Sequence, residues 1–190
     1  KAGAHDIYNF KLKRKKGLAQ SIVALSTTAA VTVAAVPISL ADALILSPIE
    51  VAQINGLAQL YEINKGEDSK QFLNSIVEVG TVSTAAKAAI STLKAVPGIN
   101  IAASVLNAII AGAIVAAIGE GCIYAFEKVY TGEKSIEDID WVKKVMESKL
   151  SPQFIENVTA VAEKISKSSN NKDVGKLVNS LLSTIPTRKM

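Results

Sequence analysis

The segment 96–119 contains no charged residue over 24 consecutive positions. A run of that length can form a helix that crosses a bilayer, and in a soluble protein it must be covered almost completely by other elements. Small residues recur within it every four positions, at Ala108, Gly112 and Ala116. Such a ridge lets a second helix backbone approach closely. We therefore expect residues 99–130 to form a central helix against which other helices pack tightly.

A second uncharged segment spans residues 17–36 and is followed by Pro37, which cannot continue a helix. Serine and threonine dilute this segment, and the mean hydropathy of the chain is only +0.29. We therefore expect 17–36 to be a core helix of a soluble bundle. The alternative is an integral-membrane or pore-forming hairpin in which 17–36 and 96–119 are the two spans, with a basic flank that fits the positive-inside rule.

A third helix begins after the turn-like stretch that follows Pro37. Ser47 can cap a helix, Pro48 suits the first helical position, and Glu50 completes a capping box. This pattern predicts a helix over 48–63. Asp42 and Ser47 are expected to shape the turn that precedes it.

A fourth helix is indicated by a further capping pair, Asp68 and Gln71. Apolar residues then recur at helical spacing, which predicts an amphipathic helix over 70–93. Pro97 and Gly98 end this helix and form the turn that leads into the uncharged segment.

The last third of the chain has mixed charge and three shorter apolar stripes, which begin near Ser135, at Ser151-Pro152 and near Val174. The expected fold class is therefore all-α: a helical bundle with long alanine- and glycine-rich helices and a C-terminal three-helix tail. Aromatic residues make up only 5% of the chain, which suits closely packed helices. We divide the chain into a basic N-terminal linker (1–16), a helical core (17–132) and a C-terminal helical extension (133–190).

Five basic residues lie within six positions just before the first apolar segment: Lys11, Lys13, Arg14, Lys15 and Lys16. They are candidates for contact with phosphate groups. A positive cluster beside an apolar helix favours an anionic membrane surface, at about 1 kcal/mol per basic residue. A solvated linker is the plainer alternative. Nucleic acid is not expected as a partner, since no alternating aromatic and basic residues follow.

No constellation of catalytic residues is present. The chain has one histidine, His5, and one cysteine, Cys122, and it lacks a phosphate-cradling Gly-x-x-x-x-Gly-Lys-Ser/Thr loop. Cys122 lies in an apolar stretch typical of a buried, inert thiol. Acidic residues near Glu137 are expected to favour a helix start through the helix dipole. We therefore expect a protein that is not an enzyme and has no metal site and no cofactor.

Two stretches resemble a known family. The first runs from Ala35-Val36-Pro37-Ile38-Ser39-Leu40-Ala41-Asp42 through Ser47-Pro48-Ile49-Glu50-Val51 to Leu60-Tyr61, and the second is Val96-Pro97-Gly98-Ile99-Asn100 with the small-residue helix to Phe126-Glu127. They resemble the bacterial domain of unknown function that lies behind Era-like GTPase domains, and the likeness covers about residues 17–130. The sequence departs from the family pattern at Glu50 (usually glutamine), Glu62 (usually glycine) and Asn100 (often glycine).

The resemblance implies a bacterial module that lies C-terminal to an Era-like GTPase domain, in the cytoplasm or at the inner face of the cytoplasmic membrane. It implies no catalytic residues. Because the chain lacks a P-loop and does not begin with Met, we expect it to be the trailing part of a GTPase-linked protein. Its expected partners are an Era-like GTPase domain, in cis or in trans, and an anionic membrane surface.

Overall fold

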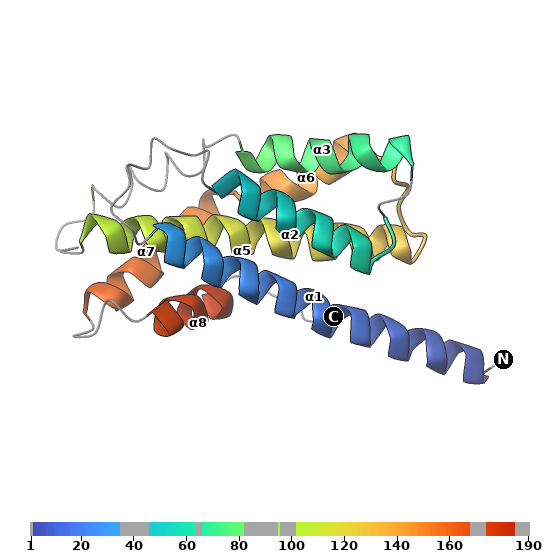
Figure 1. Ribbon diagram of the computed structural model, residues 1–190, viewed down its shortest axis with the longest axis horizontal. Coiled ribbons are helices and arrows are strands. Elements are labelled where there is room, and N and C mark those ends of the chain that lie inside the picture. The colour runs from blue at the N-terminus through green and yellow to red at the C-terminus, as the bar shows by residue number, and fades with distance from the viewer. Residues whose placement is uncertain are drawn as a thin grey trace.

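The computed structural model describes residues 2–34, 46–63, 66–81, 95, 102–167 and 174–184. These residues form helices and short connections and contain no β-strand, so the predicted all-α bundle is confirmed (Figure 1). The helices are α1 (Ala2–Ala34), α2 (Leu46–Leu60), α3 (Glu67–Thr81), α5 (Ala103–Tyr130), α6 (Ile139–Lys149), α7 (Pro152–Ser166) and α8 (Val174–Thr184).

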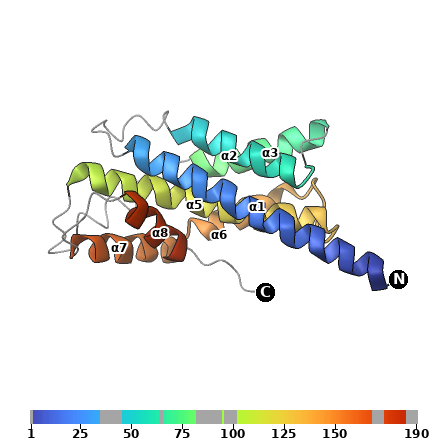
Figure 2. The same ribbon diagram turned by 60° about the horizontal axis from the view of Figure 1, so that its bottom comes forward.

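Helix α5 is the centre of the bundle, as its uncharged sequence predicts. It packs against α1, α2, α6, α7 and α8, and Figure 2 shows it running through the middle of the molecule between α1 and the C-terminal helices. Within 104–130, 94% of the most apolar stretch is buried by the rest of the chain. The helix ends at Tyr130, and Gly132 then takes a positive φ of 75°.

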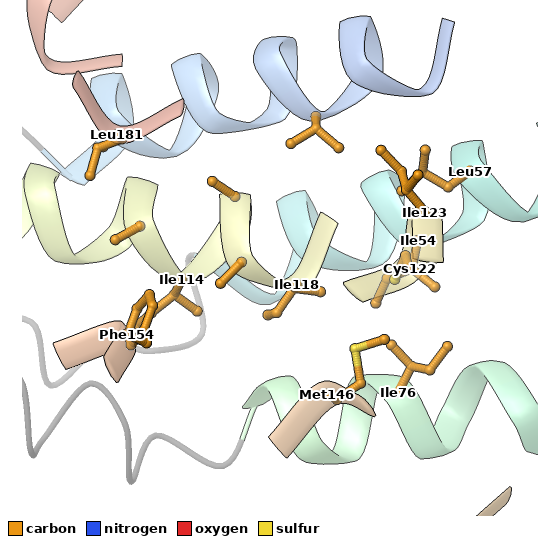
Figure 3. Packing of buried hydrophobic residues seen from close by; sticks show 14 of the residues in the cluster. Ile54, Leu57, Ile76, Ile114, Ile118, Cys122, Ile123, Met146, Phe154 and Leu181 are labelled. Atoms are coloured by element: carbon orange, nitrogen blue, oxygen red, sulfur yellow. The ribbon is translucent and has the colours of Figure 1, made fainter. Parts of the chain in front are cut away.

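The C-terminal helices share the hydrophobic core of the earlier ones. Met146 from α6, Phe154 from α7 and Leu181 from α8 belong to the same buried cluster as Ile54 and Ile118 (Figure 3). The expected boundary between a core and an extension therefore does not separate two hydrophobic cores.

Helix α1 is longer than the sequence suggests. Residues 1–16 were expected to be a linker, but the helix begins at Ala2 and continues without interruption to Ala34. Lysine and arginine are good helix formers, and each of the two glycines in the helix, Gly3 and Gly17, costs only about 1 kcal/mol relative to alanine. The basic run therefore lies on a helix, and in Figure 1 the start of α1 extends beyond the other helices.

Several helix boundaries differ from the predictions. Helix α5 begins at Ala103 and not at residue 99, because Ala102 has an extended backbone (φ −58°, ψ 140°), and α3 begins at Glu67 and not at residue 70. Helix α2 begins at Leu46, so Ser47 and Pro48 lie in its first turn and Ser47 does not precede the helix. It ends at Leu60 and not at residue 63, because the chain turns at Glu62 (φ 63°). Helix α6 begins at Ile139 and not near Ser135, whose carbonyl and hydroxyl oxygens accept backbone N–H bonds of a preceding turn.

Four predicted turn residues lie outside the described residues: Pro37, Asp42, Pro97 and Gly98. The same holds for residues 82–93, the second half of the expected amphipathic helix. Residues 67–81 are helical, which agrees with the first half of that prediction.

Candidate functional site

The five cations of the basic run differ in their exposure to solvent. Lys11, Lys13 and Arg14 are exposed, whereas Lys15 and Lys16 are partly buried against the bundle. Lys11 and Lys15 are four residues apart and lie on the same side of α1, so their different exposure depends on which part of the helix the bundle covers (Figure 1). Lys11, Lys13 and Arg14 are therefore the cations of the run that are most open to solvent, while the side chains of Lys15 and Lys16 are 16% and 35% exposed.

Lys15 closes the end of α2. Its ammonium group donates one hydrogen bond to the carbonyl oxygen of Leu60 (2.5 Å) and another to Oε1 of Glu62 (3.0 Å). The Nζ atom also lies 4.8 Å from the centre of the Tyr130 ring, within cation–π range. Lys15 thus connects α1 to the ends of α2 and α5.

The turn that Lys15 contacts is a Schellman motif. The N–H of Ile63 bonds to the carbonyl of Ala58, and the N–H of Glu62 bonds to the carbonyl of Gln59. Glu62 is the residue in the left-handed conformation, where glycine is usual and an L side chain costs about 1–2 kcal/mol. The ion pair with Lys15 lies at this strained position.

The outward face of α1 combines apolar and basic side chains. Ile7, Lys11, Arg14, Leu18 and Leu25 follow one another at spacings of four, three, four and seven residues, which places them on one stripe. All five are exposed, and the three apolar residues leave 59%, 49% and 71% of their surface open to solvent. We call these five residues the outer stripe.

A cleft of about 430 Å³ lies on another side of α1. Leu12, Lys16 and Gln20 of α1 form one wall. The other wall belongs to the second half of α5, with Ile123 and Tyr124 among its residues, and Lys149 at the end of α6 completes the lining.

Charges of both signs line this cleft. Lys16 pairs with Glu127 at 3.8 Å, and Lys128 pairs with Glu133. Glu120 is deeper, with only 7% of its surface exposed. Burial raises the pKa of Glu120, while a hydrogen bond from Gln20 and the charges of Lys149 and Lys16 lower it.

The contact between α2 and its neighbours contains buried polar side chains, of which the sequence indicated only Glu50, and that one as a capping residue. Neither the amide nitrogen nor the carbonyl oxygen of Gln53 has a hydrogen-bond partner among the described residues, and the same is true of the Thr27 and Tyr61 hydroxyl oxygens. Glu50, one turn before Gln53, is 5% exposed, and burial raises its pKa to about 7. Glu50 and Gln53 lie seven and four residues before the apolar Leu57, so all three share one side of the helix. Polar residues in line with apolar ones were the signal available in the sequence.

The small-residue ridge of α5 faces α1 and α8. A Cβ atom on Gly112 would lie 2.5 Å from Cγ2 of Val31 and 2.7 Å from Cδ1 of Leu181. Ala108 and Ala116, one turn to either side, are completely buried. Only a residue without a side chain fits between these helices at position 112.

The described residues hold no group of three or more His, Cys, Asp or Glu side chains able to bind a metal ion. Cys122 is completely buried, and burial raises the pKa of its thiol. A thiol in that environment is poorly reactive.

A family model matches residues 8–152, and its description is "Domain of unknown function (DUF697)". The match includes the basic run, α5 and the whole of α6. No curated protein and no solved structure matches the chain.

Proposed function

The chain belongs to the DUF697 family of unknown function, and on that premise we propose that it is a non-catalytic helical module that binds an anionic membrane surface through the outer stripe. The module would be the C-terminal part of a GTPase-linked protein. Its place would be the inner face of the bacterial cytoplasmic membrane.

The composition of the outer stripe is the observation that supports membrane binding. Helices that lie in a membrane interface carry large apolar side chains and basic residues, and they bind through both. Ile7, Leu18 and Leu25 supply the apolar contacts, and Lys11 and Arg14 supply positive charge between them. Three large apolar residues exposed along one helical stripe are typical of an interaction surface.

The positions of the remaining cations limit the strength of this binding. Lys15 and Lys16 are engaged with Glu62 and Glu127, and Lys13 is rotated by about 200° from Lys11. Lys11 and Arg14 are therefore the cations of the run that reach lipid phosphates together with the outer stripe. At about 1 kcal/mol each, these two cations together with the apolar residues would give reversible, salt-sensitive binding.

The link to a GTPase rests on the resemblance of 35–61 and 96–127 to the domain that follows Era-like GTPases. The chain itself has no P-loop, so a nucleotide would have to be bound by a separate domain. In this proposal, an Era-like domain in cis or in trans binds the nucleotide, and the helical module binds the membrane or a partner.

Vesicle co-sedimentation tests the membrane proposal. The protein should bind anionic vesicles more strongly than neutral ones, and binding should fall as salt rises to about 0.5 M, because the Debye length shrinks to a few ångströms. Replacing Lys11, Lys13 and Arg14 with Gln should remove most of the preference.

Two control variants separate charge from apolar contact. Replacing the exposed lysines Lys144, Lys164 and Lys167 with Gln changes the net charge equally and should leave binding almost intact. Replacing Leu18 and Leu25 with Ser should weaken binding at every salt concentration. Equal binding by the wild type and by the variant of the basic run would contradict the proposal.

The two long apolar helices support a second candidate, a membrane-spanning hairpin. Residues 6–34 and 104–130 are long and apolar enough to cross a membrane. In α5, however, 94% of the most apolar stretch is already covered by protein, compared with 28% in α1. Resistance of the membrane-bound protein to carbonate washing would favour the hairpin, and release by high salt would favour surface binding.

A further inference from the structure

The cleft beside α1 has the size of a small-molecule site. Its volume of about 430 Å³ falls within the range of roughly 300–1,000 Å³ that is usual for such sites. Leu12 and Ile123 are apolar residues of its lining, and Tyr124 adds an aromatic ring. These side chains can cover the apolar body of a ligand.

The charges that line the cleft are balanced, with three lysines and three glutamates. Two of the lysines and two of the glutamates are paired with each other, Lys16 with Glu127 and Lys128 with Glu133. This leaves one anion, Glu120, and one cation, Lys149. Neither forms an ion pair within 4.0 Å with any residue that the structure describes.

Glu120 can accept more hydrogen bonds than the protein supplies. Its side chain is hydrogen-bonded to Gln20, whereas a carboxylate has about four acceptor positions. Lys149 and Lys16 act on Glu120 only through their charge at longer range. Since a buried carboxylate is costly unless it is paired, a ligand ammonium group would complete its environment.

We infer that this cleft binds a small zwitterion that carries an ammonium group and a carboxylate on an apolar body. The ammonium group pairs with Glu120, the carboxylate pairs with Lys149, and the apolar body lies against Leu12, Ile123 and Tyr124. A ligand with only positive charge would face the lysines without compensation, and a ligand with only negative charge would face the glutamates. A neutral α-amino acid with a large apolar side chain has the required combination.

This inference does not depend on the proposed membrane contact. Lys16 lines the cleft, and Leu18 belongs to the outer stripe. Two residues along a helix correspond to a rotation of about 200°, so the cleft and the stripe lie on opposite sides of α1. A vesicle and a zwitterion would therefore contact different surfaces.

Isothermal titration calorimetry with L-leucine and L-phenylalanine tests the inference. At least one of them should bind with a saturable isotherm. The matched analogues that lack one charge, isoamylamine and 4-methylpentanoate for leucine, and phenethylamine and 3-phenylpropionate for phenylalanine, should bind about tenfold more weakly or not at all, since each loses one charge-assisted contact.

Protein variants assign the two contacts. Glu120→Gln and Lys149→Gln should each weaken binding of the zwitterion about tenfold or more. Glu147→Gln, at an exposed position on α6 that does not line the cleft, should leave it unchanged. Far-UV circular dichroism checks that each variant folds. If Glu120→Gln does not fold, Lys149→Gln at the end of α6 still tests the inference.

Two results would overturn the inference. One is the absence of saturable binding of both amino acids to the wild-type protein at concentrations up to about 10 mM, ten times a millimolar Kd. The other is binding that persists equally in Glu120→Gln and Lys149→Gln, or binding in which the single-charge analogues equal the zwitterions.

Discussion

Lys15 of α1 donates a hydrogen bond to the carbonyl oxygen of Leu60, the last residue of α2, at a distance of 2.5 Å. The carbonyls in the last turn of a helix have no partner within the helix. A cation at that position supplies a donor and also interacts favourably with the negative end of the helix dipole. This contact joins two residues that are 45 positions apart in the sequence and lie on different helices.

Replacing Lys15 with Met should therefore lower the free energy of unfolding. Methionine keeps most of the apolar stem but removes the hydrogen bonds to Leu60 and Glu62, and we expect a loss of about 1–2 kcal/mol. Urea unfolding followed by circular dichroism measures the change. Lys13→Met, at an exposed position on the same helix, is the control and should change stability by less than about 0.5 kcal/mol. Equal effects of the two variants would show that the contact contributes nothing.

The left-handed conformation of Glu62 makes a second prediction. Glu62→Ala removes the ion pair with Lys15 and keeps the unfavourable backbone conformation, whereas Glu62→Gly removes both. The glycine variant should therefore be about 1 kcal/mol more stable than the alanine variant. Thermal or urea unfolding of the two proteins gives this difference directly. A more stable alanine variant would mean that position 62 is not left-handed in solution.

The close approach at Gly112 makes a third prediction. Gly112→Leu should lower the free energy of unfolding by about 1–3 kcal/mol, because its side chain would overlap Val31 and Leu181. Gly17→Ala is the matched comparison in α1, where a Cβ atom meets nothing within 4 Å. That change should stabilise the protein by up to about 1 kcal/mol, since alanine is the better helix former. Unchanged stability of Gly112→Leu would show that this part of the α5 ridge is not packed against α1 and α8.

The buried carboxyl group of Glu50 predicts a dependence of stability on pH. Its pKa is about 7 in the folded protein and about 4.5 when it is unfolded, so the folded state holds its proton more tightly. Stability from this group is fully present below about pH 4.5 and is lost as the pH rises towards 7. The expected loss is a few kcal/mol at most.

Glu50→Gln should remove this dependence. The variant should be more stable than the wild type at pH 8 and nearly equal to it at pH 4.5, as measured by urea unfolding at both values. Glu147→Gln, at an exposed position, serves as the control and should show no such difference. A wild-type advantage at pH 8 would mean that the Glu50 carboxylate has a favourable partner in the folded protein.

The sequence predicts the helical class and the central place of α5 because both depend on local patterns. An uncharged run of 24 residues has to be covered, and periodic apolar residues define which face is covered. The C-terminal stripes with Phe154 and Val158 and with Val142 and Met146 are buried as their spacing indicates. The start of α7 at Pro152 also agrees with the prediction of a helix from Ser151-Pro152, since proline suits the first helical turn.

Helix ends were less well predicted, for identifiable reasons. A basic cluster gives no stop signal, so nothing in residues 1–16 distinguishes a solvated helix from a linker. The end of α2 depends on Glu62, a residue without a glycine's preference for positive φ, and the contact with Lys15 that accompanies it comes from a distant segment. Local rules cannot anticipate a turn that is accompanied by a tertiary contact.

The sequence alone therefore determined the all-α class and the place of most helices, that α5 must be enclosed and that the chain has no phosphate-cradling loop motif. Only the tertiary structure decided that Lys15 and Lys16 turn inward while Lys11 and Arg14 stay exposed, and that Glu120 and Lys149 line one cleft. The reason is physical: helical periodicity depends only on the order of residues within one segment. The direction from which a neighbouring helix approaches is set by packing among segments that lie far apart in the chain.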